Sequence, residues 1–197
     1  FDKDRHVKET ERRPNDFHYF SIDFNVEPFS GIASHIWQDQ RGHHAHTFGT
    51  AKLREASINA MAEWIESMCP QRHLIRITGD RGGLSRSISK KGPIRLFTEL
   101  RKRLKISEAQ LTVPSNPTHM KSREDYNYVL AAHPDYRIDP SCKRLVADHI
   151  TVEVDGYGKI IKADRKQAAQ QADELDCSRY MVNTYLRGWL DQHKRRS

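Results

Sequence analysis

Apolar and polar side chains alternate along the first third of the chain, after a charged N-terminal stretch. The alternation covers residues 18–25, 31–38 and 44–48, with the sequences HYFSIDFN, GIASHIWQ and HAHTF. A period of two residues is typical of strands that bury one face. Turn-forming residues separate these segments at 27–30 and 39–42. The pattern therefore predicts a meander of three antiparallel strands.

After the three predicted strands, the spacing of apolar residues changes from the period of a strand to that of a helix. Residues 52–68 carry apolar side chains at helical spacing and predict a helix. Residues 73–80, HLIRITGD, form a short apolar run that is typical of a buried strand ending in a glycine-bearing loop. A second helix is predicted over 93–104, because proline suits a first helical turn. The long connection after the meander favours parallel pairing of the 73–80 strand with the strand at 18–25.

The second half of the chain is mainly helical in pattern. Helices are predicted over 122–132, 141–154 and 171–190, and further short strands over 111–113 and 157–162. The order of elements predicts an α/β fold in which one mixed sheet carries helices on its faces.

The length of 197 residues fits one domain. Residues 1–16 are charged and poor in apolar groups, and we expect them to be a linker from a longer protein. Residues 17–190 form the predicted domain, and residues 191–197 are expected to be a basic, frayed tail.

Composition argues against secretion and against a membrane protein. No stretch approaches the roughly 20 apolar residues of a membrane span, and the opening residues lack the apolar core of a signal peptide. Cys69, Cys142 and Cys177 are odd in number and form no C-x-x-C pair, which indicates neither a cysteine zinc site nor a disulfide framework. A reducing cytoplasm is the expected setting.

Positive charge is concentrated in the middle of the chain. The net charge is +7, and eleven lysines and arginines lie between Arg72 and Lys105, opposed only by Asp80 and Glu99. Such a concentration is typical of proteins that bind nucleic acid. A solvated helix face is the alternative interpretation.

Two aspartates are associated with the predicted strands. Asp23 lies between Ile22 and Phe24, where a carboxylate is costly to desolvate unless it has a partner. Asp80 ends the next apolar strand, and ligand groups in α/β folds gather at the carboxyl ends of strands. If the two strands are parallel neighbours, the two carboxylates can approach each other. The alternative is a hydrogen-bonded edge residue for Asp23 and a turn residue for Asp80.

Two further aspartates lie on the last predicted helix. Asp173 and Asp176 are three residues apart and share a face of that helix. Acidic residues are also favoured near a helix N-terminus by the macrodipole, an explanation that suits Asp173 better than Asp176. Together the acids predict a carboxylate cluster built from two strands and a helix. Mutual repulsion in such a cluster is relieved by protonation or by a hard divalent cation such as Mg²⁺.

The same segments resemble the nuclease domains of tailed-phage large terminase subunits. YFSIDFNVEP at 19–28 resembles their first acidic motif, ITGDRGG at 77–83 their second and DCSRY at 176–180 their third. NPTHMKSREDYN at 116–127 and DPSCKRL at 139–145 are similar to two other recurring stretches. The five matches occur in order along most of the chain.

The resemblance implies an RNase H-like mixed sheet of about five or more strands with helices on both faces. It implies that Asp23, Asp80 and Asp176 are the catalytic, metal-binding acids and that they hold two Mg²⁺ or Mn²⁺ ions. The implied activity is cleavage of double-stranded DNA concatemers during genome packaging. Asp173 stands where the family often has histidine, so it is either an additional ligand or a neighbour of the site.

The resemblance also implies partners and a location. These are double-stranded DNA, an N-terminal packaging ATPase domain, the portal protein and the small terminase subunit. The run GDRGGLSRS lacks the phosphate-binding P-loop pattern, so an ATP site is not expected in this chain. The implied location is the host cytoplasm, with transient attachment to the procapsid portal.

Basic residues near the acids are candidates for phosphate contacts. Solvent exposure and structural ion pairs are the alternatives. The candidates are Arg81, Arg86, Lys90, Lys91, Arg123 and Lys143.

His43, His44 and His46 form an H-H-x-H cluster at a predicted strand turn. The spacing is compatible with a transition-metal site, but with no cysteine nearby we expect exposed histidines.

Two other functions remain open on the sequence. The same fold is compatible with a junction resolvase or a nuclease for RNA–DNA hybrids. The basic surface is also compatible with a non-catalytic module that docks DNA or the portal.

Overall fold

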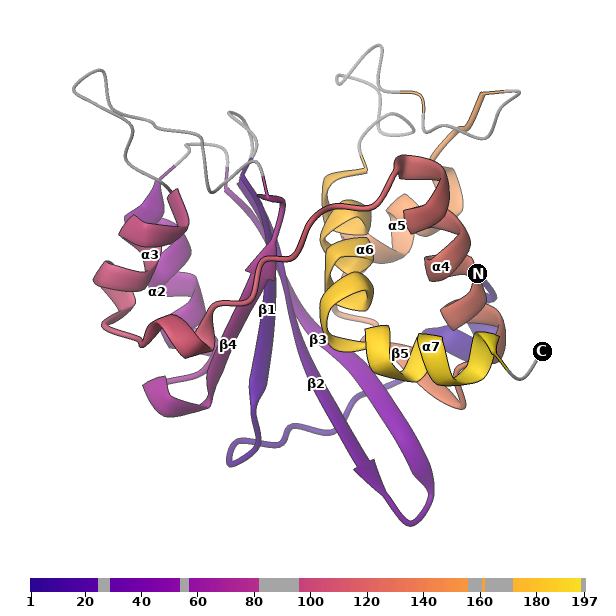
Figure 1. Ribbon diagram of the computed structural model, residues 1–197, viewed down its shortest axis with the longest axis horizontal. Coiled ribbons are helices and arrows are strands. Elements are labelled where there is room, and N and C mark those ends of the chain that lie inside the picture. The colour runs from indigo at the N-terminus through magenta and orange to yellow at the C-terminus, as the bar shows by residue number, and fades with distance from the viewer. Residues whose placement is uncertain (25–28, 54–56, 82–95, 156–160, 162–171, 196–197) are drawn as a thin grey trace.

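The computed structural model describes residues 1–24, 29–53, 57–81, 96–155, 161 and 172–195. Its centre is a five-stranded mixed sheet in the order β4-β1-β2-β3-β5 (Figure 1). The first three strands form the expected antiparallel meander, and β4 pairs in parallel with β1 as predicted. The strands are β1 (His18–Phe24), β2 (Phe29–Asp39), β3 (Gly42–Leu53), β4 (Ile75–Gly79) and β5 (Asp135–Ile138).

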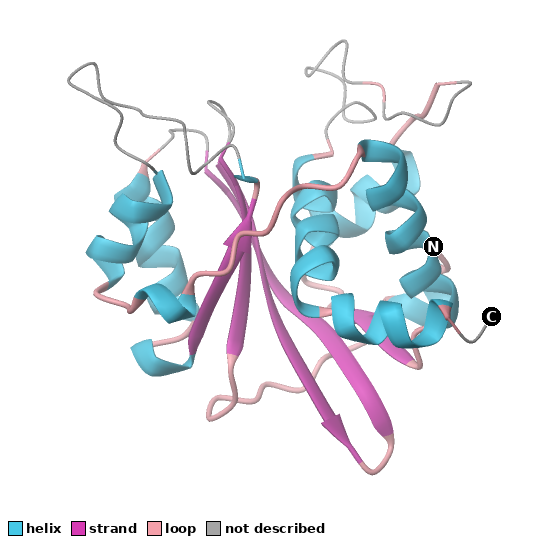
Figure 2. Cartoon of the chain, in the orientation of Figure 1, coloured by secondary structure: helices cyan, strands magenta, loops and turns pink. Residues whose placement is uncertain are grey.

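Helices cover both faces of the sheet, as expected (Figures 1 and 2). Two helices, α2 (Ile58–Met68) and α3 (Leu96–Leu104), pack on one face. The other face carries α4 (His119–Ala132), α5 (Lys143–Thr151), α6 (Asp173–Tyr185) and α7 (Arg187–Lys194). Single 3-10 turns form at Arg72–Leu74 and Glu108–Gln110.

The alternation along β1 assigns its side chains to these two layers. Phe20, Ile22 and Phe24 are fully buried in the core formed with α2 and α3. Asp23 lies between two of them and therefore faces the opposite layer, where α6 packs. Burial of the three apolar side chains fixes the register, since a shift of one residue would turn Asp23 into the apolar core.

Several predicted boundaries differ from the structure. The helix expected over 52–68 begins at Ile58, because β3 continues to Leu53 and the Ser57 hydroxyl caps the helix by accepting from the Ala60 amide at 3.3 Å. The helix expected over 171–190 is two helices, α6 and α7, which join at Leu186.

The short strands were predicted less well than the helices. Residues 111–113 form only an isolated bridge between Ile77 and Leu111. Most of the strand expected over 157–162 lies outside the described residues. The edge strand β5 was not predicted.

The N-terminal segment packs on the domain, in contrast to the linker expected over residues 1–16. A short helix, α1 (Lys3–His6), lies against the edge of the sheet at β5. The Arg5 guanidinium donates to the carbonyls of Ala131 and His133 at 2.8 and 3.0 Å. His6 is buried and its Nε2 contacts the Leu130 carbonyl at 2.9 Å.

None of the helices in the described ranges combines the length and the apolar character needed to cross a membrane.

Candidate active site

Asp23 and Asp80 lie at the carboxyl ends of neighbouring parallel strands. The register pairs Ile22 of β1 with Gly79 of β4, so Asp23 and Asp80 are the residues that directly follow this pair along the chain. The Asp80 amide donates to the Ile22 carbonyl at 3.0 Å, which extends the pairing to the last residue before the loop. Both side chains are at least nine-tenths buried, with exposures of 4% and 9%. The predicted approach of these two strand ends is confirmed.

Asp176 reaches this end of the sheet from α6. Two hydroxyl groups hold the helix against β4, since Thr184 Oγ1 and Thr78 Oγ1 lie 2.7 Å apart. Buried Cys177 packs on β2, with its Sγ 3.5 Å from the Ser30 carbonyl, and Ser30 is the residue paired with Asp23. These contacts place the N-terminal half of α6 over the strand that carries Asp23.

Tyr180 links the three predicted acids in space. It lies one helical turn after Asp176. Burial raises the pKa of its phenol, and the negative charges of Asp23, Asp176 and Asp80 raise it further. The charges of all three carboxylates therefore act on the same half-buried phenol. The sequence motif included this tyrosine but gave it no role.

Hydrogen bonds from polar side chains orient two of the acids. The Arg179 guanidinium donates to Asp176 Oδ1 at 2.9 Å, and it also donates to Ser122 Oγ at 3.1 Å and to the His119 carbonyl at 3.0 Å. It therefore joins α6 to the start of α4. The Asn116 side chain donates to Asp80 Oδ1 at 2.7 Å from the segment before α4.

Asp173 belongs to a neighbouring group of acids. It is buried, and its Oδ2 lies 3.5 Å from Nζ of Lys52 on β3. Burial, assisted by the charge of Asp173, raises the pKa of Asp148 to about 7. Burial and then the charge of Asp148 raise the pKa of Glu174 to about 8. A role for Asp173 as an additional metal ligand stays a prediction.

The predicted basic contacts are only partly described. Arg81 is exposed beside Asp80, and its guanidinium donates to Ser115 Oγ. Arg123 is half-buried on α4, and Lys143 is exposed at the start of α5. The remaining three candidates, Arg86, Lys90 and Lys91, lie outside the described residues.

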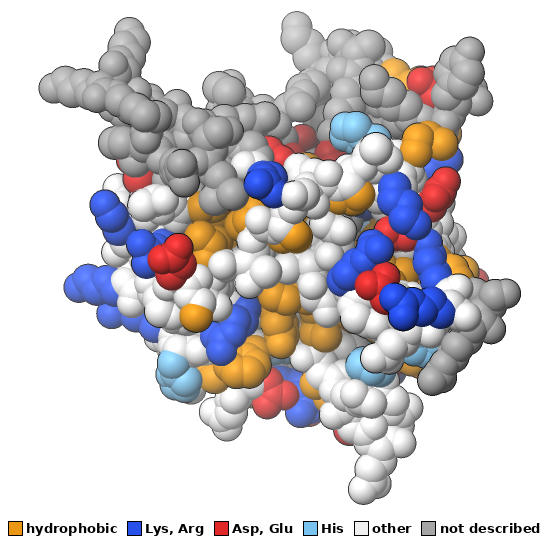
Figure 3. Space-filling model, viewed as in Figure 1, with side chains coloured by type: hydrophobic (Ala, Val, Ile, Leu, Met, Phe, Trp, Pro, Cys, Tyr) orange, Lys and Arg blue, Asp and Glu red, His pale blue; other side chains and the backbone are white. Residues whose placement is uncertain are grey.

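Other basic side chains gather over α4 and α7, interleaved with acids (Figure 3). Buried Asp125 lies 3.0 Å from Lys121 Nζ, 3.0 Å from Arg187 and 2.5 Å from Lys194 Nζ. The ion pairs with Asp125 therefore explain why these three basic side chains cluster, and no bound polyanion is needed to explain it.

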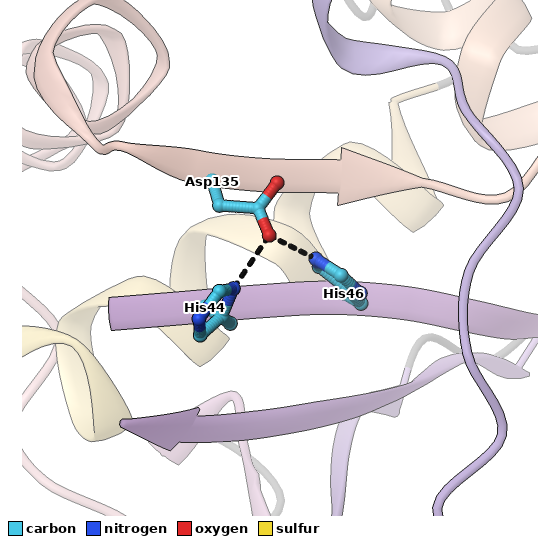
Figure 4. Close-up of side chains that lie close together, drawn as sticks. All are labelled: His44, His46 and Asp135. Atoms are coloured by element: carbon cyan, nitrogen blue, oxygen red, sulfur yellow. Dashed lines mark hydrogen bonds and ion pairs between the residues drawn. The ribbon is translucent and has the colours of Figure 1, made fainter. Parts of the chain in front are cut away.

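The expectation of exposed histidines at the strand turn is wrong for His44 and His46. Their exposures are 8% and 3%, because β3 is longer than predicted and β5 pairs alongside it. Both rings contact Asp135 of β5, with His44 Nδ1 at 2.6 Å and His46 Nε2 at 2.8 Å from the same oxygen, Oδ2 (Figure 4). We call these three residues the histidine cluster.

The donor set around Tyr180 fits a hard divalent cation. Buried carboxylates from two strands and a helix offer oxygen ligands, which Mg²⁺ and Mn²⁺ prefer. Burial and mutual repulsion make it energetically unfavourable for these carboxylates to be ionised together without a counter-ion. A bound cation offsets that free-energy cost.

Solved structures reveal the same arrangement of elements. The P22 large terminase nuclease domain superposes with a TM-score of 0.66 at 16% identity, over 92% of this chain and 88% of that one. The fold is that of a large terminase nuclease domain. The expected RNase H-like sheet is therefore confirmed.

Two further terminase structures agree with this assignment of the fold. The large terminase of a thermophilic bacteriophage gives a TM-score of 0.67 at 17% identity over 94% of this chain, which spans 44% of that protein. The nuclease domain of g2p, the large terminase of bacteriophage SPP1, was solved with bound Mn and gives 0.53 at 14% identity, over 87% of each chain. No family model and no curated protein matches the sequence.

Proposed function

We propose that this chain is the nuclease domain of a large terminase and cleaves double-stranded DNA with divalent metal ions. The proposal rests on two observations: Asp23 and Asp80 lie at the carboxyl ends of the paired strands β1 and β4, and the charges of Asp23, Asp80 and Asp176 all act on Tyr180. The fold shared with terminase nuclease domains, one of them solved with Mn, supports it.

The three aspartates would hold the metal ions. Asp23 lies on β1, between β4 and β2, and is therefore best placed to contribute to both ions of a pair. Asp80 and Asp176 would each complete the ligand shell of one ion. When bound, two such ions activate a water molecule and stabilise the leaving oxygen of a phosphodiester.

Neighbouring residues would keep these ligands in position. Asn116 donates to one oxygen of Asp80, and Arg179 to one oxygen of Asp176. Hydrogen bonds of this kind fix the orientation of a carboxylate that binds a metal ion through its other lone pairs. Arg81 is exposed beside Asp80 and carries a fixed positive charge, which suits it to bind a DNA phosphate next to the reacting one.

The wider assembly follows from the same proposal. The chain would act within a large terminase that also carries a packaging ATPase domain, and it would meet the portal protein and the small subunit. The site of action would be the host cytoplasm, at the procapsid portal.

Cleavage of supercoiled plasmid tests the proposal. We expect nicking with Mg²⁺ or Mn²⁺, none in EDTA and none from Asp23→Asn, whose charge loss removes the central ligand. Asp191→Asn is the matched control, because Asp191 is an exposed residue of α7 that pairs only with Arg187 among the described contacts. Equal nicking by Asp23→Asn and Asp191→Asn would overturn the assignment. A four-way junction and an RNA–DNA hybrid, tested in parallel, identify a different substrate for the same metal centre.

A further inference from the structure

The histidine cluster lies far from the proposed nuclease centre. Asp23 pairs with Ser30, and Ser30 pairs with Lys52 near the end of β3. His44 precedes Lys52 by eight residues on the same strand. At the usual rise of a strand, eight residues span about 26 Å. The two groups of ligands therefore occupy opposite ends of the sheet.

Strand geometry brings the cluster together. His44 and His46 are alternate residues of β3, so their side chains share one face of the sheet. Asp135 is the residue paired with His44 on the parallel strand β5. His44 Nδ1, His46 Nε2 and a carboxylate oxygen of Asp135 all lie within 4.8 Å of one another (Figure 4).

Surrounding side chains fix the orientation of each ligand. His44 Nε2 lies 2.9 Å from Asp39 Oδ1, so the ring holds a carboxylate on the side opposite Asp135. Trp37 stacks on the His44 ring with centroids 4.5 Å apart and an interplanar angle of 10°. Arg137 Nε donates to Asp135 Oδ1 at 2.5 Å, which turns Oδ2 toward the two histidines.

We propose that His44, His46 and Asp135 bind a divalent transition-metal ion, with Zn²⁺ as the best fit. Two imidazole nitrogens and one carboxylate oxygen form a common zinc ligand set, with a water molecule in the fourth position. A carboxylate on the second nitrogen of a metal-bound histidine, the place of Asp39, is typical of zinc sites. The two nitrogen ligands also give this site a different metal preference from the proposed site at Asp23, whose ligands are all oxygen atoms and favour Mg²⁺ or Mn²⁺.

Metal binding requires a small rearrangement. Ligand atoms about 2.0–2.1 Å from a tetrahedral zinc ion lie about 3.3 Å apart. The contacts of 2.6 and 2.8 Å would therefore open by roughly half an ångström, which side-chain torsions accommodate. The ion would replace two hydrogen bonds and join the β2–β3 hairpin to the four-residue edge strand β5.

Binding of Zn²⁺ and Co²⁺ to the purified protein tests the proposal. We expect one Zn²⁺ per chain in native mass spectrometry, a rise in the melting temperature with Zn²⁺, and the visible absorption of four-coordinate Co²⁺. His46→Gln and Asp135→Asn should lose all three responses. Asp135→Asn keeps an oxygen that can accept hydrogen bonds from both rings, so this variant should still fold. A loss of metal binding in Asp135→Asn would then not be due to misfolding. Circular dichroism checks the fold of each variant.

Two further variants identify where the ion binds. Asp23→Asn removes the proposed nuclease ligand and should keep the response to Zn²⁺ and Co²⁺. Asp39→Asn should weaken zinc affinity by about 10-fold or more, because it loses the carboxylate that orients His44. The proposal is overturned if the wild type shows no Zn²⁺ response, if folded His46→Gln responds like the wild type, or if Asp23→Asn abolishes the response. Each of these results leaves the plasmid-cleavage test unaffected.

Discussion

Replacing Gly79 by alanine tests whether the close approach of β4 to β1 brings Asp80 beside Asp23. Gly79 is the last residue of β4 and has a φ of +155°, a backbone conformation that side chains rarely adopt. A Cβ atom at this position would lie 2.0 Å from the Ile22 carbonyl oxygen and 2.9 Å from its carbon. The same oxygen accepts the hydrogen bond from the Asp80 amide.

The cost of this substitution has two sources. The backbone conformation is strained for any residue with a Cβ, by about 1–3 kcal/mol. A contact of 2.0 Å is also about 1 Å too short for a Cβ and an oxygen, so the strands must separate, and overpacking of this kind costs about 1–3 kcal/mol. We expect the free energy of unfolding to fall by roughly 2–6 kcal/mol, a large part of the total for a domain.

The assay combines urea unfolding with plasmid cleavage below the melting temperature of the variant. We expect Gly79→Ala to lose cleavage even where it remains folded, because β4 moves away from β1 and carries Asp80 with it. Gly188→Ala is the matched control, since no atom lies within 4 Å of its added Cβ and it lies within α7. Alanine there should stabilise the helix by about 0.5–1 kcal/mol. If Gly79→Ala matched the wild type in stability and cleavage, the proposed strand geometry would be refuted.

Acidification and loss of a buried ion pair give two further predictions. Burial lowers the pKa values of His35 and His149 to about 4, so the folded protein keeps both neutral while the unfolded chain binds protons below about 6.5. The stability from these neutral histidines is therefore complete well above pH 6.5 and is lost as the pH falls toward 4, by about 1.4 kcal/mol for each histidine at pH 5.5. Urea unfolding should show a larger loss of stability between pH 7.5 and 5.5 for the wild type than for the double variant with His35→Asn and His149→Gln. Equal losses would contradict the prediction. Arg179→Met should lower the free energy of unfolding by about 3–5 kcal/mol, because Asp176 loses its buried partner. Added Mn²⁺ should restore part of this stability by supplying a new positive charge. If the variant without metal were as stable as the wild type, the pairing of Arg179 with Asp176 would be refuted.

Local patterns were sufficient to predict the part of the site carried by strands. The alternation of Phe20, Ile22 and Phe24 fixes which face Asp23 occupies, and the long connection after the meander predicts parallel pairing of the strand that ends at Asp80. The place of Asp176 is different. Its helix reaches the sheet through tertiary contacts such as the one between Thr184 of α6 and Thr78 of β4, which no local period encodes.

The histidine cluster illustrates what the sequence could not predict. Asp135 is 91 residues away from His44 along the chain. Its strand, β5, has four residues, too few for a recognisable period of two. Without that strand, the sequence predicts an exposed turn for the histidines. The charged N-terminal residues were misleading for a similar reason, because Arg5 is held by carbonyl groups of a distant helix end.

A crystal soaked in Mn²⁺, measured for anomalous scattering at the manganese edge, tests the central claim most directly. The account predicts density bounded by Asp23, Asp80 and Asp176, beside Tyr180, and its loss in crystals of Asp23→Asn. Mn²⁺ bound elsewhere in the protein with none among these three aspartates would contradict it.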